Sequence, residues 1–255
     1  PFPYANDKRS ALSVYERGKL TSQYFTKARR GPEILFYLTD LWINAYFILK
    51  SHATFSICIA LDCLNTINTI PFCFIGKINK LIFYTIDYVP KRFQNRLLNF
   101  LYHFTDKIAC SYSDAIWVLS PKMTEMRLKN GIAKMSPQVT IPMGANLSRI
   151  HPLPISKINR HQIVFAGHLL EKQGIQLVIK ALPNIIKIIN DVKFVIIGKG
   201  EYEEKLKNMA YNLNLSKNIA FLGFIENHSD VEKILCSSAI GLAPYMPTPD
   251  SYLLY

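Results

Sequence analysis

The fold is decided by residues 162–200, which read QIVFAGHLLEKQGIQLVIKALPNIIKIINDVKFVIIGKG. Two short apolar runs, QIVFAG and KFVIIG, flank a longer segment in which apolar residues recur every three or four positions. The short runs predict strands that are buried on both faces, and the spacing between them predicts an amphipathic helix that packs on the sheet. A strand, a helix and a strand in this order indicate a parallel α/β unit.

The helix of this unit begins after Gly174. Its apolar stripe comprises Ile175, Val178, Ile179, Leu182, Ile185, Ile186 and Ile189. We expect Pro183 to kink the helix, because proline has no N–H group to donate.

The same alternation continues along most of the chain. We assign strands to EILFYLT, TFSICIAL, KLIFYTI, AIWVLS and QVTIP in the first half, and to QIVFAG, KFVIIG, NIAFLG and AIGLAP in the second. The segment between the two series contains two prolines among polar residues, which is typical of a linker. The predicted fold class is therefore α/β, with two Rossmann-like domains built on parallel sheets. Their predicted bounds are residues 1–150 and 161–255, with the linker at 151–160.

Composition and charge limit the function. Of the 255 residues, 49% are hydrophobic and 12% are aromatic, which excludes a disordered chain. The net charge is +12, and residues 91–160 contain eleven Lys and Arg against three acids. Such a field attracts phosphates, anionic lipids or nucleic acids. We predict no nucleic-acid partner, because no helix-turn-helix, ribonucleoprotein or zinc-finger pattern occurs.

Cysteine usage points to a cytosolic protein. The five cysteines are scattered and form no CxxC pair, so we expect reduced thiols and neither a disulfide framework nor a zinc site. The sequence begins at Pro1 and ends with SYLLY after a proline-rich segment. We therefore expect both domains to be incomplete.

Two segments raise the question of a membrane. Residues 53–76 are the most apolar, but Asp62, Asn65, Asn68 and Pro71 interrupt them, so we expect a strand and a helix there and no membrane span. A second helix has an apolar stripe made of Phe93, Leu97, Leu101, Phe104 and Ile108, beside Arg92, Arg96, His103 and Lys107. A stripe of this kind usually covers a core, and we favour that interpretation; the alternative is peripheral contact with an anionic membrane.

Glycines follow three predicted strands of the second half, in FAGHLLEKQG, IIGKGE and FLGFIE. Ligands of open parallel sheets bind at the carboxyl ends of the strands, so the three glycine-bearing ends together predict a nucleotide pocket. Each one alone also fits an ordinary turn. The chain has no GxxxxGK[ST] and no GxGxxG, which disfavours a P-loop enzyme and a dinucleotide-dependent oxidoreductase.

The order of these segments is more specific than any one of them. GHLLEKQG, IIGKGEYEEKLK, FLGFI, DVEKILCSSA and IGLAP occur in the order typical of one family. The chain from Gln162 to Pro244 resembles the carboxyl-terminal domain of glycosyltransferase family 4, which comprises retaining sugar transferases of the GT-B architecture. Residues 81–149 resemble the end of the first domain of that family more loosely, through YTIDYVP, SDAIWVLSPKM and VTIPMGAN.

The resemblance implies roles for particular residues. The donor diphosphate would be bound by Gly167, His168, Lys172 and Gln173, and the nucleotide by Gly198, Gly200, Phe224 and Ile225. Two positions depart from the family pattern, because His168 replaces an Arg and Gln173 replaces the Lys before the glycine. Both changes weaken the positive charge available to the diphosphate, since imidazole is a pH-dependent cation and an amide is neutral.

Other family features are altered or absent. Asp87 takes the place of a His near the reacting sugar, so the resemblance makes Asp87 a candidate catalytic residue, although an Asp at a strand end often caps a turn. The family's pair of Glu residues is missing from residues 243–255, where Asp250 is the only acid. No DxD motif occurs, so we predict neither a metal site nor a cofactor.

The function that the resemblance implies is transfer of a hexose, with retention, from a UDP-, GDP- or similar nucleotide sugar to a glycan or lipid-linked acceptor. The expected setting is cytoplasmic, with a position at the inner membrane face as a further expectation. The alternative is a nucleotide-sugar-binding module without turnover, which Gln173 and the missing Glu pair favour.

Overall fold

The protein forms two compact α/β units. The computed structural model describes residues 9–27, 33–51, 53–132, 136–144, 147 and 150–246. Unit 1 is Pro1–Pro142 and unit 2 is Met143–Tyr255. Each unit has a four-stranded parallel sheet, which confirms the predicted fold class. The linker at residues 151–160 stays a prediction; a short 3-10 turn, Ile155–Lys157, lies within it.

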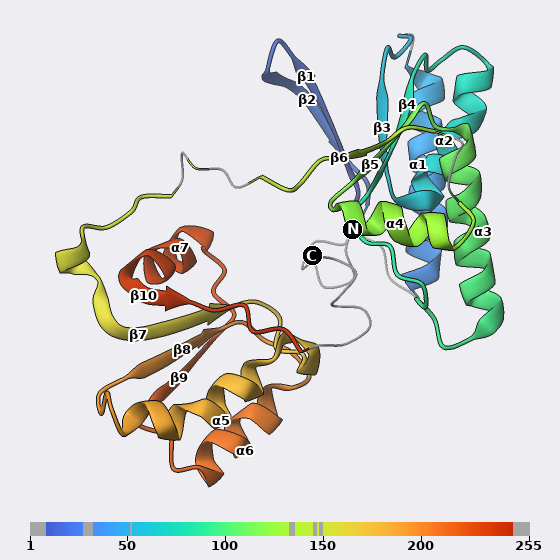
Figure 1. Ribbon diagram of the computed structural model, residues 1–255. Helices are drawn as coiled ribbons and strands as arrows, with labels where there is room; N and C mark the ends of the chain where they lie inside the picture. Colours follow the sequence, from blue (N-terminus) through green and yellow to red (C-terminus); the bar gives the residue numbers. More distant parts are fainter. Residues whose placement is uncertain are drawn as a thin grey trace. The chain divides into compact units, whose positions relative to one another are not determined.

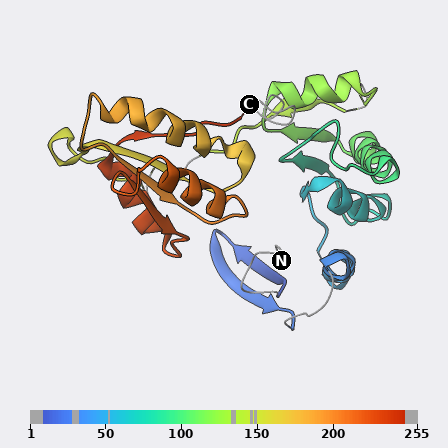
Figure 2. The same ribbon diagram turned by 90° about the horizontal axis from the view of Figure 1, so that it is seen from below.

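Unit 1 starts with an antiparallel hairpin and continues with alternating helices and strands (Figure 1). Its elements are β1 (Ala11–Glu16), β2 (Lys19–Phe25), α1 (Glu33–Lys50), β3 (Cys58–Leu61), α2 (Asp62–Phe74), β4 (Leu81–Thr85), α3 (Arg96–Tyr112), β5 (Ala115–Val118), α4 (Pro121–Lys129) and β6 (Gln138–Thr140). The sheet order is β3-β4-β5-β6. Figure 2 shows the helices of this unit along one side of the sheet.

Unit 2 has helices on both faces of its sheet (Figure 1). Its elements are β7 (Asn159–Ala166), α5 (Ile175–Ile186), β8 (Lys193–Ile197), α6 (Glu203–Asn212), β9 (Ile219–Gly223), α7 (His228–Ser237) and β10 (Ser238–Gly241). The sheet order is β10-β7-β8-β9. Alternate residues of β7 and β8 point to opposite faces, as strand geometry requires. Phe165 and Ile196 pack with α5 and α6, whereas Val164 and Val195 pack with α7.

The structure confirms most of the predicted elements and corrects two. The apolar stripe of α5 packs in the core of unit 2, although the helix ends at Ile186, before Ile189. The run EILFYLT is wrong as a strand, because it lies in the 18-residue helix α1. The Thr39 hydroxyl donates there to the carbonyls of Leu35 and Phe36, a bond pattern of a helix. In the described part of the chain, no helix is both long and apolar enough to cross a membrane.

The second correction concerns α3. Leu97, Leu101 and Phe104 are exposed, so the favoured interpretation of this stripe as cover for a core is wrong. Phe93 precedes the helix, and only Ile108 of the stripe packs in a core cluster. The buried residues of α3 are Asp106, Ala109 and Cys110.

A buried ion pair explains this orientation of α3. The Arg127 side chain on α4 is 0% exposed and donates two hydrogen bonds to Asp106, at 3.0 and 2.8 Å. Its guanidinium carbon lies 4.7 Å from the ring centroid of Tyr88 and 5.1 Å from that of Phe83. A charge taken out of water needs such a partner, so the pair draws Asp106 and its side of α3 inward.

Removal of one partner should therefore destabilise the protein more than removal of both. We expect Arg127→Met to lower the free energy of unfolding by about 3–5 kcal/mol, because it leaves the Asp106 carboxylate buried and unpaired. The double variant Asp106→Leu with Arg127→Met should lose markedly less. Urea denaturation of both variants measures the difference, and equal losses would contradict the ion pair as the cause.

Candidate functional site

The carboxyl edge of the unit 2 sheet brings three predicted loops together. The Gly167 N–H, after β7, donates to the Ile197 carbonyl at 2.9 Å. The Gly198 N–H, after β8, donates to the Gly223 carbonyl of β9 at 2.8 Å. The Leu169 N–H donates to the Lys199 carbonyl at 3.0 Å. Backbone hydrogen bonds thus join the ends of β7, β8 and β9 into one surface.

Gly198 and Gly200 are needed for this junction. Gly198 has φ +132°, a backbone region that side chains rarely adopt, and a Cβ there would overlap the Gly167 carbonyl. A Cβ at Gly200 would overlap the Leu169 carbonyl. The sequence reasoning assigned these glycines to close approach of a nucleotide. The structure shows that each one approaches the backbone of the β7 loop.

The loop after β7 leads into the amino end of α5. Gly174 starts that helix with φ +73°, and a Cβ on it would lie 2.5 Å from the Pro244 carbonyl oxygen. The first turn of α5 contains no acid, whereas α6 and α7 have Glu203, Glu204 and Asp230 in theirs. Of the three helices, α5 is therefore the one whose positive dipole end has no acid in the first turn to offset it.

One buried acceptor near this helix end has no partner. Gln176 is 6% exposed, and its Nε2 donates to the Glu171 carbonyl at 2.9 Å. Its Oε1 has no hydrogen-bond partner among the described residues. A buried oxygen without a donor is costly, which marks the start of α5 as a place where a ligand hydroxyl or water would be stabilised.

Cationic side chains are exposed at the same edge. His168 and Lys172 belong to the loop after β7, and Lys199 lies between the two glycines of the loop after β8. Lys172 borders a pocket of about 530 Å³, together with Leu170, Glu171, Glu201 and Met246. The sequence reasoning missed Lys199. Its position directly after an apolar strand was the signal that could have found it.

The remaining predicted residues of unit 2 differ in exposure. Gln173 is half-buried in the 3-10 turn Glu171–Gln173. Phe224 is 65% exposed beyond the end of β9, so its ring is accessible to a ligand. Ile225 packs against the core cluster on the α7 side of the sheet. Side-chain contact with a base is therefore open to Phe224, while Ile225 has a packing role.

Asp87 lies in unit 1, in the loop after β4. Its carboxylate forms an ion pair with Arg92, in which Oδ2 of Asp87 lies 2.9 Å from Nη1 of Arg92. The Asp87 side chain is 53% exposed. The next residue, Tyr88, is fully buried, and its hydroxyl accepts from the Asn130 amide at 2.7 Å. Tyr88 thus anchors the loop while Asp87 stays at its surface.

Asp62 is a second candidate site residue in unit 1, and the sequence analysis did not predict it. It follows β3 directly and has φ +63°, which is uncommon for a residue with a side chain. Desolvation of the carboxylate by surrounding protein atoms raises the pKa of Asp62. Hydrogen bonds from the backbone N–H groups of Asn65 and Leu64 lower it and offset part of this effect. An Asp immediately after an apolar strand was the available signal. No cluster of metal-binding side chains occurs in the described parts of either unit.

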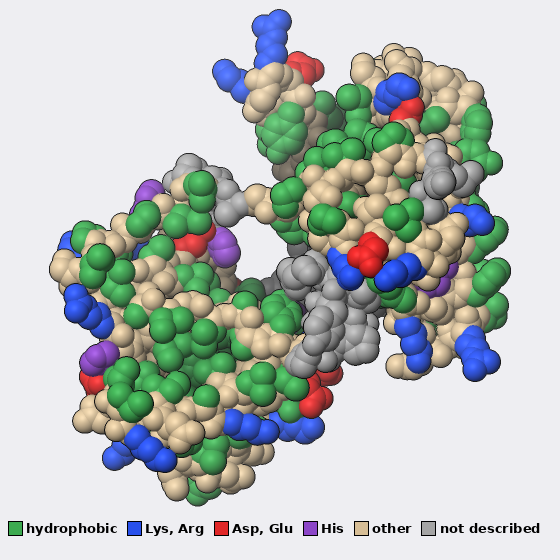
Figure 3. All heavy atoms as spheres, viewed as in Figure 1, with side chains coloured by type: hydrophobic (Ala, Val, Ile, Leu, Met, Phe, Trp, Pro, Cys, Tyr) green, Lys and Arg blue, Asp and Glu red, His purple; other side chains and the backbone are tan. Residues whose placement is uncertain are grey.

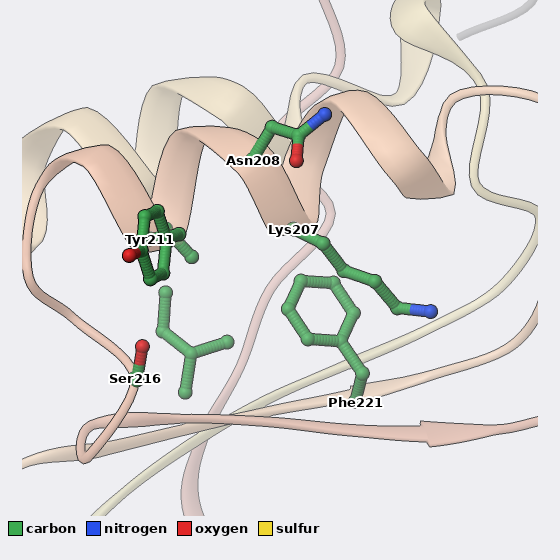
Figure 4. Close-up of a pocket in the computed structure, with 7 residues that line it drawn as sticks. Lys207, Asn208, Tyr211, Ser216 and Phe221 are labelled. Carbon is green, nitrogen blue, oxygen red and sulfur yellow. The ribbon is translucent and has the colours of Figure 1, made fainter.

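A further pocket lies away from this edge. It measures about 380 Å³ between α6 and the amino end of β9, with Lys207, Asn208, Tyr211, Ser216 and Phe221 around it (Figure 4). The predicted ligand residues are at the opposite, carboxyl ends of the strands. This pocket therefore takes no part in the candidate site.

Comparison with known proteins identifies the family of this site. The model of the family described as glycosyl transferases group 1 matches residues 154–246. Unit 2 is a group 1 glycosyltransferase domain. The matched segment contains every loop of the carboxyl edge described above.

Relatives of this group 1 domain are distant. An uncharacterized glycosyltransferase of Methanocaldococcus jannaschii is 32% identical over 87 residues, which are 34% of this chain and 22% of that protein. A GDP-mannose-dependent monoacylated alpha-(1-6)-phosphatidylinositol monomannoside mannosyltransferase of Corynebacterium glutamicum is 33% identical over 78 residues, 31% of this chain and 20% of that protein. These matches span about a fifth of the length of the curated relatives.

A solved structure supports the fold of the chain as a whole. The catalytic domain of starch synthase IV from Arabidopsis thaliana, bound to ADP and acarbose, superposes with a TM-score of 0.64 at 11% identity. The match covers 96% of this chain and 69% of that one. The group 1 domain thus lies in a chain with the GT-B fold that the sequence resemblance predicted.

The glycine junction makes a direct prediction. Gly198→Ala should lower the stability of the protein by about 2 kcal/mol or more, because both the φ angle and the Gly167 carbonyl oppose a Cβ. Gly241→Ala is the matched control, since no atom lies within 4 Å of its Cβ position and its φ is ordinary. The measurement is urea denaturation followed by circular dichroism, because both tryptophans of the chain, Trp42 and Trp117, lie in unit 1 and do not report on unit 2. Equal stability of the two variants would contradict the close approach.

Proposed function

We propose that the chain is part of a retaining glycosyltransferase that moves a hexose from a nucleotide-diphosphate sugar to a glycan or lipid-linked acceptor in the cytoplasm. Membership of the group 1 family supports sugar transfer from a nucleotide sugar. The name of the C. glutamicum relative gives GDP-mannose as its donor, and the A. thaliana structure contains ADP. These names support a nucleoside-diphosphate sugar as the donor class that we propose here, with the base and the sugar left open.

The start of α5 is the observation that supports this proposal most. A nucleoside diphosphate requires positive charge and N–H donors at one place. This helix end has no acid in its own first turn, and it follows the loop that contains His168 and Lys172. Lys199 adds a third cation at the edge of the sheet. In the transfer step the bond from the sugar to the diphosphate breaks, and negative charge builds up on the leaving oxygen. His168, Lys172 and the α5 N–H groups would stabilise that charge.

The other predicted residues take supporting roles in this proposal. Phe224 would stack against the base or the ribose at the end of β9. Gly198 and Gly200 would hold the β8 loop where its backbone faces the nucleotide. Asp87 would accept a hydrogen bond from a sugar or acceptor hydroxyl, with its carboxylate oriented by Arg92. No step in this scheme uses a metal ion.

A binding module without turnover is the second candidate. It is favoured by Gln173, which supplies an amide where the family pattern has a Lys. Residues 247–255, including Asp250, lie outside the described residues. Both candidates require nucleotide-diphosphate binding and differ only in turnover. A radiolabelled nucleotide sugar incubated with the protein and a mixture of glycan and lipid acceptors distinguishes them by transfer of label.

Nucleotide binding is testable by thermal unfolding. UDP, GDP or ADP at saturating concentration, without magnesium, should raise the melting temperature, because a ligand at about 100 times its Kd stabilises the folded state by about 2.7 kcal/mol. NAD serves as the control, since its nicotinamide half has no counterpart in the proposed site. Equal stabilisation by NAD, or none by the three diphosphates in a folded sample, would overturn the proposal.

The cation roles are testable by substitution. His168→Gln and Lys172→Ala should each weaken nucleotide-diphosphate binding about fivefold, and nucleoside binding much less, because only the diphosphate has the charge. Lys180→Ala is the matched control, since Lys180 is exposed on α5 beyond its first turn. Isothermal titration calorimetry gives the affinities.

A further inference from the structure

Helix α3 has two faces of different character. The inner face packs against α2 and β4 through Ala109 and Cys110, with Asp106 paired to Arg127. The outer face exposes large apolar side chains. Their exposed fractions are 65% for Leu97, 63% for Phe100, 45% for Leu101 and 51% for Phe104. Because these positions recur every three or four residues, they form one continuous strip, which we call the α3 strip.

The exposed charges of α3 itself, and those directly before it without an ion-pair partner among the described residues, have one sign, whereas Arg92 is paired with Asp87. Arg96 and Lys107 on the helix and Lys91 before it are exposed, and none of the three has an ion-pair partner among the described residues. The only acid of the helix, Asp106, is buried with Arg127. Figure 3 shows hydrophobic side chains along the edge of unit 1 that α3 forms, with Lys and Arg side chains near the end where the helix begins.

The apolar side chains and the positive charges of the α3 strip together indicate which partner would cover it. The rings of Phe100 and Phe104 are stacked with centroids 6.1 Å apart, so the strip presents a wide apolar surface to its surroundings. A second copy of the chain would bring another cationic strip and a net charge of +12 against the first, which is repulsive. An anionic bilayer offers the opposite charge to the lysines and arginines and an apolar layer to the phenylalanines.

We propose that the α3 strip docks unit 1 on the surface of an anionic bilayer. Leu97, Phe100, Leu101 and Phe104 enter the boundary between headgroups and acyl chains, to the depth of about 5–10 Å that is usual for interfacial helices. Lys91, Arg96 and Lys107 bind the lipid phosphates beside them. The helix lies in the plane of the surface and does not span the bilayer. This inference is independent of nucleotide binding by unit 2.

Co-sedimentation of the 255-residue chain with vesicles tests the proposal. Vesicles of phosphatidylcholine with 30% phosphatidylglycerol should bind the protein, and pure phosphatidylcholine vesicles should bind it much more weakly. Binding should fall steeply between 0.1 and 1 M salt, because the screening length shortens from about 10 to about 3 Å. Binding that depends on neither lipid charge nor salt would overturn the proposal.

Two sets of variants test the residues. Replacement of Lys91, Arg96 and Lys107 by Gln should lower the partition coefficient about a hundredfold, since each cation near an anionic surface contributes about a factor of five. The control replaces Lys180, Lys187 and Lys217 of unit 2 by Gln, which removes the same charge from exposed positions elsewhere. If both triple variants lose equal affinity, the attraction is due to net charge alone and the α3 strip is excluded.

The apolar half of the proposal has its own variant. Phe100→Ser with Phe104→Ser should weaken vesicle binding at least tenfold, whereas Ile188→Ser with Tyr211→Ser, at exposed positions of unit 2, should leave it unchanged. Circular dichroism confirms that each variant is folded, and UDP, GDP or ADP binding gives a readout that the α3 changes should not alter. Sedimentation equilibrium covers the alternative occupant. A dimer that the Phe pair variant dissociates, with vesicle binding unchanged, would make the strip a protein interface and overturn the proposal.

Discussion

The candidate site depends on one backbone contact, the approach of the β8 loop at Gly198 to the β7 loop at Gly167. No Cβ fits between the two loops at this point. Because Gly198 has no side chain, the loops come close enough for main-chain hydrogen bonds to join the ends of β7, β8 and β9. The side chains of Lys172 and Lys199 take no part in these main-chain hydrogen bonds. The loops are therefore joined by backbone groups, and both lysine side chains are exposed at the edge of the sheet.

A second constraint organises unit 1. The Arg127–Asp106 pair links α3 to α4, and the same guanidinium packs against the ring of Tyr88 in the loop after β4. One buried charge pair therefore supports two features of unit 1. It supports the loop that presents Asp87, and it turns the polar side of α3 inward so that the α3 strip faces outward. A helix whose inner face is taken by an ion pair has its apolar residues available for another surface.

The two units differ in how well the sequence predicted them. In unit 2 every predicted strand is present, and the apolar stripe of α5 packs in the core. The prediction succeeded because short buried strands that flank a strongly amphipathic helix are compatible with few folds other than a parallel α/β sheet. The convergence of the strand ends also followed from the parallel order. Lys199 and Gln176 were missed because a lysine between glycines and a glutamine in an apolar helix look ordinary until their burial and neighbours are known.

In unit 1, the run EILFYLT is too short to show a clear helical or strand period, which is why the sequence favours a strand there. The structure shows that the run is the start of an 18-residue helix, α1. The α/β class, the positions of the unit 2 strands along the chain and the glycines at their ends were predictable from the sequence, since these depend on local pattern and backbone sterics. The order of the strands in the sheet, β10-β7-β8-β9, and the face of α3 that meets the core came from the tertiary structure. Periodicity shows which residues share a face, whereas the side that is buried depends on a partner charge 21 residues away at Arg127, which no local pattern reveals.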